Sequence, residues 1–416
     1  MKYLITRPQH LSARVELPRS KSLSNRALII GKLCGASKDS IKDLSDCDDT
    51  FVMQRALNIL ESEDGGQPSI IDVQAAGTSM RFLTALLSVT PGVHIITGTE
   101  RMRKRPIGVL VDALRKLGAN ISYVENEGYP PLRIEGGKLN GGSVELAGNV
   151  SSQYVSALLM IGPTLEQGLT LHLTGEIVSL PYINMTLALM KHFGAVAEWA
   201  DECTVSVHPQ RYNSAINYTV EADWSAASYW FEMLALADST NDFIELPGAN
   251  AEESLQGDSW VADAFKKLGV DYMAPRYVRT NQHATRLEED FTECPDLAQT
   301  FVVTCCMLNV PFRFTGLQSL RIKETDRISA LQTELRKLGY VVDAIGDCEM
   351  TWSGQRCQPE EEPVIKTYDD HRMAMAFAPV ALIRGSIFIE NPEVVSKSYP
   401  QYWEHLIQAG FTVTEC

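Results

Sequence analysis

The segment ALRKLGANISYV, residues 113–124, has the pattern of a helix end followed by a strand. Apolar residues at helical spacing lead to Gly118, and glycine commonly follows the last turn of a helix in the left-handed conformation. A short run typical of a strand comes next. The same arrangement occurs at LMKHFGAVAEWA (189–200), AFKKLGVDYMAP (264–275), ELRKLGYVVDAI (334–345) and HLIQAGFTVTEC (405–416).

The five glycines of this pattern indicate an internal repeat. They are Gly118, Gly194, Gly269, Gly339 and Gly410, and neighbouring ones are 70 to 76 residues apart. A unit of that length is too large for a solenoid repeat, and six such units account for the 416 residues. Each unit has room for two helices and three or four strands. Short β-branched segments bounded by glycine, such as VHIITGTE, LTLHLTGEI and PFRFTGLQ, are the candidate strands, which predicts an α/β fold.

Composition and charge exclude several classes of protein. The net charge of −15 argues against a general nucleic-acid binder. The nine cysteines show no metal-ligand spacing, and the adjacent Cys305 and Cys306 are poorly placed for a structural disulfide. The first residues do not resemble a signal peptide, and no apolar run is long enough to span a bilayer. We therefore expect a cytoplasmic protein with reduced thiols and no membrane partner.

Several predicted helices begin with polar or cationic residues and continue as strongly apolar segments, which predicts that they are buried. They are SKSLSNRALIIG (20–31), AAGTSMRFLTALLS (75–88), SSQYVSALLMIG (151–162), PDLAQTFVVTCCML (295–308), KETDRISALQTEL (323–335) and DDHRMAMAFAPVAL (369–382). Ordinary capping accounts for the Ser, Thr and Asp residues. It does not account for Arg81, Arg327 and Arg372, since a cation is unfavourable at the positive end of a helix. Converging starts of this kind would bind an anion such as a phosphate or carboxylate.

Other charged residues extend this set. Lys21 and Arg26 lie in the first of these helices, Arg105 precedes Pro106, and Lys397 lies in a short turn. Carboxylates stand next to the cations, namely Glu324, Asp326, Asp296, Asp369 and Asp370. Two readings stay open from the residues alone. The carboxylates are either structural ion pairs or general acids and bases beside bound anions.

Seven motifs in order identify a family. SKSLSNRAL, AGTSMR, RPIG, SSQ, KETDR, DDHRMAM and KSYP occur between Pro18 and Pro400, and the chain resembles the 5-enolpyruvylshikimate-3-phosphate synthases, or 3-phosphoshikimate 1-carboxyvinyltransferases. The resemblance implies a two-domain enolpyruvyl transferase fold, in which each domain has three βαβαββ units with buried helices and outer sheets. The implied domains are residues 21–221, and residues 1–20 together with 222–416. Helix N-termini would face a cleft between them.

The resemblance also implies a reaction. The enolpyruvyl group of phosphoenolpyruvate would pass to the 5-hydroxyl of shikimate 3-phosphate with release of phosphate, on the shikimate pathway to chorismate and the aromatic amino acids. No metal or organic cofactor is expected. The partners would be these two small molecules, with no nucleic acid and no membrane, and the enzyme would be a monomer.

The site residues follow by matching motifs. Asp296 would be the base near the hydroxyl and Glu324 would handle the methylene proton, while Lys21 and Lys397 stabilise charge. The phosphoenolpyruvate contacts would be Lys21, Gly77, Arg105, Gln153, Arg327, Arg372 and Lys397. The shikimate 3-phosphate contacts would be Ser22, Arg26, Ser151, Ser152, Ser179, Tyr182, Asp296, Ser319 and Lys323.

Three positions depart from the family pattern. Ala75 and Ser319 stand where Asn is usual, and Phe82 replaces a proline. Two rival functions are also considered. The sister enzyme that transfers enolpyruvyl to UDP-N-acetylglucosamine typically has a reactive cysteine in its first domain, but no cysteine lies between Cys47 and Cys203. A catalytically silent anion-binding homologue would have no need for Asp296 and Glu324 together with both lysines.

Overall fold

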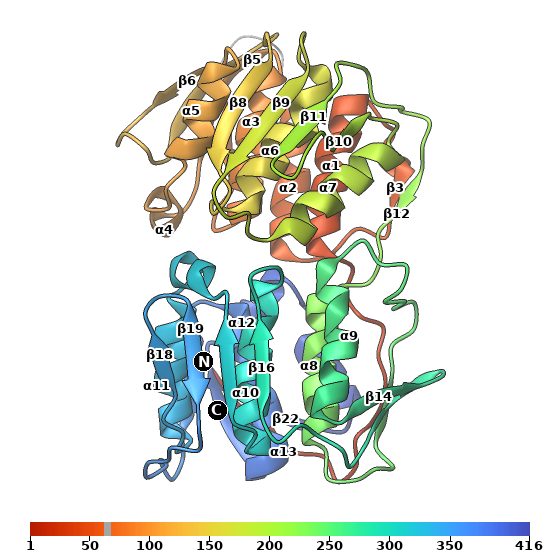
Figure 1. The fold of residues 1–416 in the computed structure, drawn as a ribbon, viewed down its shortest axis with the longest axis vertical. Helices are drawn as coiled ribbons and strands as arrows, with labels where there is room; N and C mark the ends of the chain where they lie inside the picture. The colour runs from red at the N-terminus through yellow and green to blue at the C-terminus, as the bar shows by residue number, and fades with distance from the viewer. Residues whose placement is uncertain (62–67) are drawn as a thin grey trace. The chain divides into compact units, whose positions relative to one another are not determined.

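The chain divides into two compact units (Figure 1). One unit is Arg19–Glu221, and the other combines Met1–Pro18 with Ala222–Cys416. The structure, a computed structural model, describes residues 1–61 and 68–416. None of the helices in these two ranges has the length and apolar character needed to cross a membrane.

Two sheets of the 19–221 unit share one topology. Within each sheet the first two strands are parallel, and the remaining strands pair antiparallel in the order first, second, fourth, third. One sheet contains β4 (Ser69–Asp72), β5 (Gly92–Thr97), β7 (Leu132–Gly136) and β6 (Asn120–Tyr123). The other contains β8 (Gly142–Ala147), β9 (Leu169–Thr174), β11 (Thr204–Val207) and β10 (Ala197–Trp199). A helix joins each parallel pair and a hairpin ends the unit, so each is a βαβαββ repeat.

The 1–18 and 222–416 unit has three sheets of the same topology. One contains β16 (Leu287–Asp290), β17 (Phe312–Thr315), β19 (Glu349–Trp352) and β18 (Asp343–Ile345). The second contains β20 (Val364–Ile365), β21 (Ser386–Glu390), β1 (Lys2–Thr6) and β22 (Thr412–Glu415). The third contains β2 (Ser12–Arg14), β13 (Phe243–Glu245), β15 (Arg276–Arg279) and β14 (Val270–Met273). Strands from the start of the chain therefore complete two sheets built from its second half.

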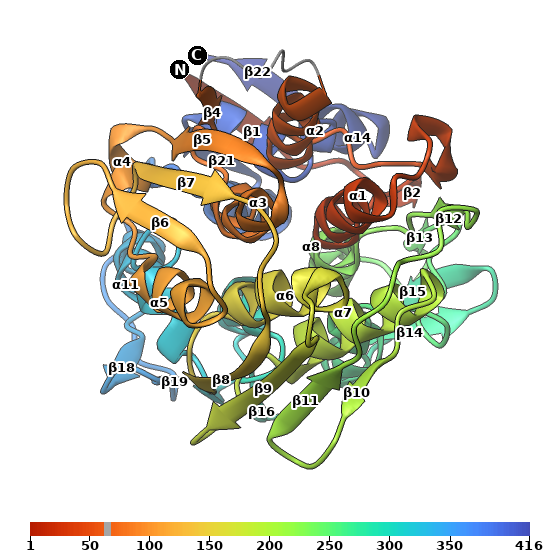
Figure 2. The same ribbon diagram turned by 90° about the horizontal axis from the view of Figure 1, so that it is seen from above.

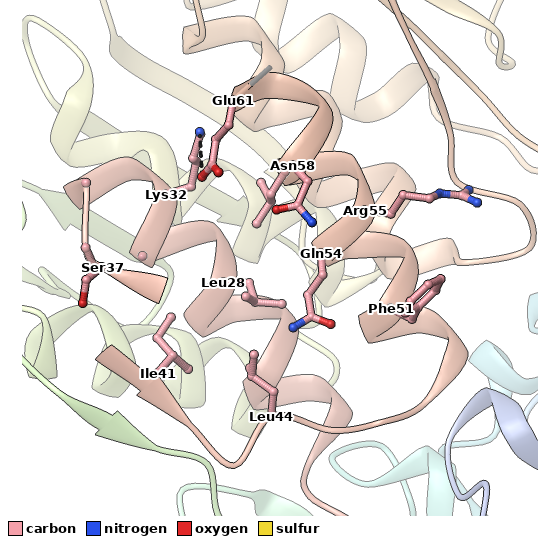
Figure 3. Close-up of a pocket in the computed structure, with 14 residues that line it drawn as sticks. Leu28, Lys32, Ser37, Ile41, Leu44, Phe51, Gln54, Arg55, Asn58 and Glu61 are labelled. Atoms are coloured by element: carbon pink, nitrogen blue, oxygen red, sulfur yellow. Dashed lines mark ion pairs between the residues drawn. The ribbon is translucent and has the colours of Figure 1, made fainter. Parts of the chain in front are cut away.

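A sixth, smaller sheet lies in the 19–221 unit. It pairs β3 (Ile41–Lys42) with β12 (Tyr218–Thr219) in parallel, and these are its two strands within the described residues. Beside it, a cavity of about 620 Å³ opens between α1 (Lys21–Cys34) and α2 (Asp48–Glu61) (Figure 3). Leu28, Ile41, Leu44 and Phe51 line this cavity, and the Lys32–Glu61 ion pair lies at its edge. The predicted site residues are not among those that line it.

Apolar helices form the interior of each unit. In the 19–221 unit α1, α3 (Gly77–Val89) and α6 (Ser152–Ile161) contact one another, and Figure 2 shows β5, β6 and β7 on the outer side of α3. In the other unit the mutually packed helices are α8 (Trp224–Leu236), α10 (Ala298–Leu308) and α12 (His371–Phe377). Helices without a polar face bury nearly every side chain, as α3, α6, α8, α10 and α12 do. The predicted arrangement of buried helices and outer sheets is confirmed.

The second helix of each repeat precedes the final hairpin. These are α5 (Gly108–Lys116), α7 (Leu180–His192), α9 (Val261–Ala264) with the 3₁₀ turn η4 (Phe265–Leu268), α11 (Arg327–Lys337) and α14 (Tyr402–Gln408). The five glycines of the sequence repeat follow them with φ between 81° and 106°, a region in which other residues are strained. The repeat prediction is therefore confirmed at the level of backbone conformation.

Two helix predictions need correction. The segment 323–335 was expected to be buried, but α11 begins at Arg327 and exposes Ser329, Thr333 and Arg336 on one face. The segment 369–382 is not one helix. It passes from α12 through the 3₁₀ turn η7 (Ala378–Val380) into α13 (Ala381–Arg384), because Pro379 cannot donate the backbone hydrogen bond of a continuous helix.

Candidate functional site

The start of α1 carries a lysine held by a carboxylate. Ser20 caps this helix by accepting a hydrogen bond from the Leu23 amide at 3.5 Å, and Lys21 and Ser22 are its first two residues. Lys21 Nζ lies 3.3 Å from Asp49 Oδ2 of α2. The ammonium group is thus placed at the positive end of a helix, where it favours an incoming anion.

Arg26 is a buried cation that holds three helices together. Its guanidinium donates to Thr186 Oγ1 at 2.7 Å, Ser156 Oγ at 3.1 Å and the Ser22 carbonyl at 2.9 Å. It also lies over the ring of Phe82, 5.3 Å from the centroid. Burial lowers the pKa of Arg26 to about 10, since no charge among these acceptors compensates for the lost hydration.

Phe82 is therefore a residue of the α3 core, fully buried beneath Arg26. Ala75, the neighbouring departure from the family pattern, is exposed instead. The two substitutions have different consequences. Phe82 shapes the support of a predicted substrate ligand, whereas Ala75 removes an amide from the surface.

Two arginines surround the start of α3. A Cβ atom built on Gly77 would lie 2.6 Å from Arg105 Nη1 and 3.1 Å from Arg81 Nη1. Arg81 Nη1 donates to the Gly77 carbonyl at 3.0 Å, and its guanidinium lies over the ring of Tyr154. Tyr154 in turn donates to the Pro106 carbonyl at 2.7 Å, which fixes the segment that carries Arg105. Only glycine leaves room for Arg105 at this helix start.

The start of α6 lies against that of α3. Ser151 caps α6, Ser152 is its first residue, and Gln153 Nε2 donates to Thr78 Oγ1 of α3 at 3.1 Å. Nearby, Ser179 precedes α7 with a φ of 57°, and the Tyr182 carbonyl accepts from Arg26 Nη2 at 3.5 Å. The sequence-predicted residues of the 19–221 unit are thus brought together at neighbouring helix starts.

The charges of this group favour anions. Lys21 is paired with Asp49, but the hydrogen bonds that orient Arg26 go to hydroxyl and carbonyl oxygens. Such bonds position a guanidinium without neutralising its charge. The group can therefore bind a phosphate or carboxylate through charge-assisted hydrogen bonds.

Arg327 is the centre of a second group, in the 222–416 part of the chain. Its side chain is 1% exposed and donates to three carboxylates. Nε lies 2.7 Å from Asp370 Oδ2, Nη1 lies 2.9 Å from Asp296 Oδ1, and Nη2 lies 3.1 Å from Glu324 Oε2. Burial opposes its charge, but the three carboxylates outweigh burial and raise its pKa above the ordinary arginine value.

Asp296 lies between three cations. Arg372 Nη2 donates to Oδ2 at 2.9 Å, while Arg327 and Lys323 contact Oδ1, the latter at 3.4 Å. Burial opposes ionisation of this carboxyl, but the charges of Arg372, Lys323 and Arg327 hold its pKa well below the usual aspartate range. Asp296 is thus held in its ionised form, and an ionised carboxylate can accept a proton.

Glu324 bridges Arg327 and Lys397. Lys397 Nζ donates to Glu324 Oε1 at 2.8 Å, and both side chains are 15% exposed. Lys397 ends the 3₁₀ turn η8 (Pro392–Lys397), far along the chain from α11. The contact is an ion pair at the edge of the group. Asp296 and Glu324, the two predicted catalytic carboxylates, therefore both accept hydrogen bonds from Arg327.

Ser319, the remaining departure, lies in the 3₁₀ turn η6 (Gln318–Ile322) just before this group. Its hydroxyl oxygen is buried and has no hydrogen-bond partner within the described residues. A buried hydroxyl without a partner is costly, and a substrate oxygen would satisfy it. This is consistent with its predicted place among the shikimate 3-phosphate contacts.

Sequence reasoning missed several residues that hold these groups in place. Asp49 and Thr78 orient Lys21 and Gln153, and Ser225 and Tyr229 lie against Arg372. Each is an ordinary helix residue that no local pattern singles out. Asp370 lies two residues before Arg372 in the sequence, and the structure gives it a second role as the buried partner of Arg327.

Known proteins resemble this chain over nearly its whole length. The family model described as EPSP synthase (3-phosphoshikimate 1-carboxyvinyltransferase) matches residues 5–406. The chain is 57% identical to the 3-phosphoshikimate 1-carboxyvinyltransferase of Bacteroides fragilis (strain YCH46), over 99% of both chains. It is 37% identical to the enzyme of that name from Shewanella halifaxensis, over 94% of this chain and 96% of the relative.

Solved structures show the same fold at low sequence identity. An EPSP synthase from Acinetobacter baumannii superimposes with a TM-score of 0.77 at 20% identity, over 100% of both chains. The enolpyruvyl transferase NikO from Streptomyces tendae gives a TM-score of 0.71 at 16% identity, covering 99% of this chain and 98% of that one. The predicted resemblance, fold class and enzyme class are confirmed. This chain belongs to the EPSP synthase (3-phosphoshikimate 1-carboxyvinyltransferase) family.

Proposed function

We propose that this protein transfers the enolpyruvyl group of phosphoenolpyruvate to the 5-hydroxyl of shikimate 3-phosphate and releases phosphate. The product leads to chorismate and the aromatic amino acids. The observation that carries the proposal is the pair Asp296 and Glu324, each joined to Arg327 and to a further cation. Addition and elimination each need one proton acceptor and one proton donor, and this pair can supply both.

The addition step uses the two carboxyl groups differently. Asp296 accepts the hydroxyl proton while the hydroxyl oxygen bonds to C2 of phosphoenolpyruvate. Glu324, with Lys397 as its proton-donating neighbour, delivers a proton to the C3 methylene. In elimination Glu324 takes a proton back from the resulting methyl group, the C2–O bond to phosphate breaks, and the double bond returns. Asp296 gives the proton that it accepted to the departing phosphate. Lys21 and Lys397 stabilise the charge that develops on the leaving phosphate.

Anion binding prepares Asp296 for this role. Phosphate and carboxylate groups of the substrates compete for Arg372 and Lys323, whose charges otherwise lower the pKa of Asp296. As these cations turn to the substrates, the carboxylate becomes a stronger base. The basicity of Asp296 thus increases when the 5-hydroxyl of shikimate 3-phosphate arrives.

The substrate contacts that we propose are those implied by the family resemblance. We assign phosphoenolpyruvate to Lys21, Gly77, Arg105, Gln153, Arg327, Arg372 and Lys397. We assign shikimate 3-phosphate to Ser22, Arg26, Ser151, Ser152, Ser179, Tyr182, Asp296, Ser319 and Lys323. The units 19–221, and 1–18 with 222–416, would be the two enolpyruvyl transferase domains.

The remaining features of the proposal concern partners and location. The reaction as written balances without a metal or organic cofactor, and the strongly acidic chain has no nucleic-acid partner. All nine cysteines are free thiols, which suits a reducing cytoplasm. We propose a monomer, which sedimentation would test.

The test is phosphate release. Purified protein with phosphoenolpyruvate and shikimate 3-phosphate together should release phosphate, and either substrate alone should not. Replacing shikimate 3-phosphate by UDP-N-acetylglucosamine tests the sister activity. Asp296→Asn and Glu324→Gln serve as controls that keep the shape of each side chain. Phosphate release with UDP-N-acetylglucosamine as the acceptor would reject the assignment. Rates of phosphate release in both variants that equal the wild-type rate would reject it as well.

A further inference from the structure

Asp258 is a buried carboxylate that the proposed mechanism does not use. It lies in the 3₁₀ turn η3 (Gly257–Trp260), is 4% exposed, and accepts a hydrogen bond from the Ser225 hydroxyl. Ser225 is the second residue of α8, so the contact joins two segments of the same unit. Neither residue belongs to the predicted set of substrate ligands.

The Ser225 hydroxyl has one proton, and Asp258 determines where it points. An ionised carboxylate only accepts hydrogen bonds, so the proton faces Asp258 and the lone pairs of Ser225 Oγ face away. Arg372 Nη2 lies 3.4 Å from that oxygen and 2.9 Å from Asp296 Oδ2. Arg372 Nη1 donates to Tyr229 at 3.3 Å. Ser225 and Tyr229 therefore contact the Arg372 guanidinium in addition to Asp296.

We propose that Asp258 is a positioning residue for phosphoenolpyruvate binding, because it turns the Ser225 lone pairs toward Arg372. The inference rests on the proposed function, which assigns Arg372 to this substrate. When Asp296 turns to the substrate hydroxyl, its contact with Arg372 weakens. Ser225 and Tyr229 then keep the guanidinium oriented toward the donor substrate.

The surroundings of Asp258 make its ionisation adjustable. Burial and the negative charge of Asp296 raise its pKa to about 6, opposed by the hydrogen bond from Ser225 and the charge of Arg372. Asp223, the N-cap residue of α8, also acts to raise this pKa, and the Cys294 thiol lies beside it. Asp258 therefore holds the Ser225 hydroxyl as an acceptor for Arg372 above about pH 6.

The experiment compares Asp258→Asn with Asp263→Asn. Asp263 lies in the adjacent helix α9, but its side chain is 76% exposed and pairs with Lys266. Steady-state phosphate release gives kcat and the two KM values between pH 5 and pH 8. We expect Asp258→Asn to raise KM for phosphoenolpyruvate about tenfold at pH 8, with smaller changes in kcat and in KM for shikimate 3-phosphate. Asp263→Asn should match the wild type.

The pH dependence separates this role from a structural one. The ratio of variant to wild-type KM for phosphoenolpyruvate should fall toward one near pH 5. At that pH the wild-type Asp258 carboxyl is protonated and, like the Asn side chain, carries no charge. Ionisation of the substrate cancels in that ratio. Ser225→Ala should raise the same KM with a ratio independent of pH, and it replaces Asp258→Asn if that variant does not fold.

The outcomes are distinct. A wild-type enzyme inactive with both substrates would reject the proposed function. An active wild type would reject the Asp258 inference alone if the variants kept KM for phosphoenolpyruvate within twofold, or if the Asp258→Asn ratio did not change with pH.

Discussion

Gly77→Ala should displace Arg105 without unfolding the protein. The added Cβ would lie 2.6 Å from Arg105 Nη1, which is too close for that atom to remain. It would also lie 3.1 Å from Arg81 Nη1, a tight contact that a small adjustment of that side chain relieves. The clash involves the end of a flexible side chain rather than backbone, so Arg105 moves and α3 stays in place. Gly77 does not have a positive φ, and alanine is the better helix former by up to about 1 kcal/mol. Stability should therefore be unchanged or slightly higher.

The cost should appear in substrate binding. Losing one charge-assisted hydrogen bond costs about 1.5–3 kcal/mol, which corresponds to roughly a 10- to 150-fold higher KM for phosphoenolpyruvate. KM for shikimate 3-phosphate should change little, since its predicted ligands do not contact Gly77. Phosphate-release kinetics give both constants, and calorimetry gives the melting temperature.

Two comparisons make this test decisive. Gly108→Ala is the matched control, because Gly108 also begins a helix, α5, and its added Cβ would meet its nearest neighbour at an ordinary 3.5 Å. In an Arg105→Ala background, Gly77→Ala should have almost no further effect on KM, since the displaced group is already gone. The reasoning would be refuted if Gly77→Ala raised KM for phosphoenolpyruvate equally in the wild-type and Arg105→Ala backgrounds. It would also be refuted if Gly77→Ala alone left this KM within twofold of the wild-type value.

Three further outcomes are expected. Glu324→Gln should lower kcat by about 10²–10⁴-fold with KM values nearly unchanged, because it removes a proton-transfer group while keeping its shape; normal turnover would contradict its role. Glu232 is fully buried in α8, and burial holds its pKa well above the usual glutamate value, so it folds in the protonated form. Its stabilising contribution is present below about pH 4.5 and is lost as the pH rises toward its folded pKa. The melting temperature of Glu232→Gln should therefore rise relative to that of the wild type as the pH increases from 4.5 to 8. Parallel curves of melting temperature against pH for the two proteins would exclude this. Phe82→Leu should cost about 1–2 kcal/mol of stability and raise KM for shikimate 3-phosphate several-fold through Arg26, whereas an unchanged KM would show that the ring does not support that ligand.

Much of the fold could be read from local pattern. Gly118 and its four counterparts mark helix ends because a left-handed backbone conformation depends on the residue itself and its immediate neighbours. The apolar sequences of α3, α6 and α10 also predicted burial from local pattern, since a helix without a polar face must be surrounded by other protein. The cations of the candidate site were also visible in the sequence. Arg327 and Arg372 stand at helix starts and Arg81 is the fifth residue of α3, positions where capping does not require a cation.

What those side chains contact was decided by tertiary structure. Arg105 reaches Gly77, Phe82 lies under Arg26, and Ser225 contacts both Asp258 and Arg372, all across long stretches of chain. Strands β1 and β2 likewise pair with partners more than 200 residues away. A sequence pattern records which face of an element is apolar, and periodicity carries that information within a few turns. It does not record which faces meet, because that choice depends on how all the elements bury their apolar surface at once.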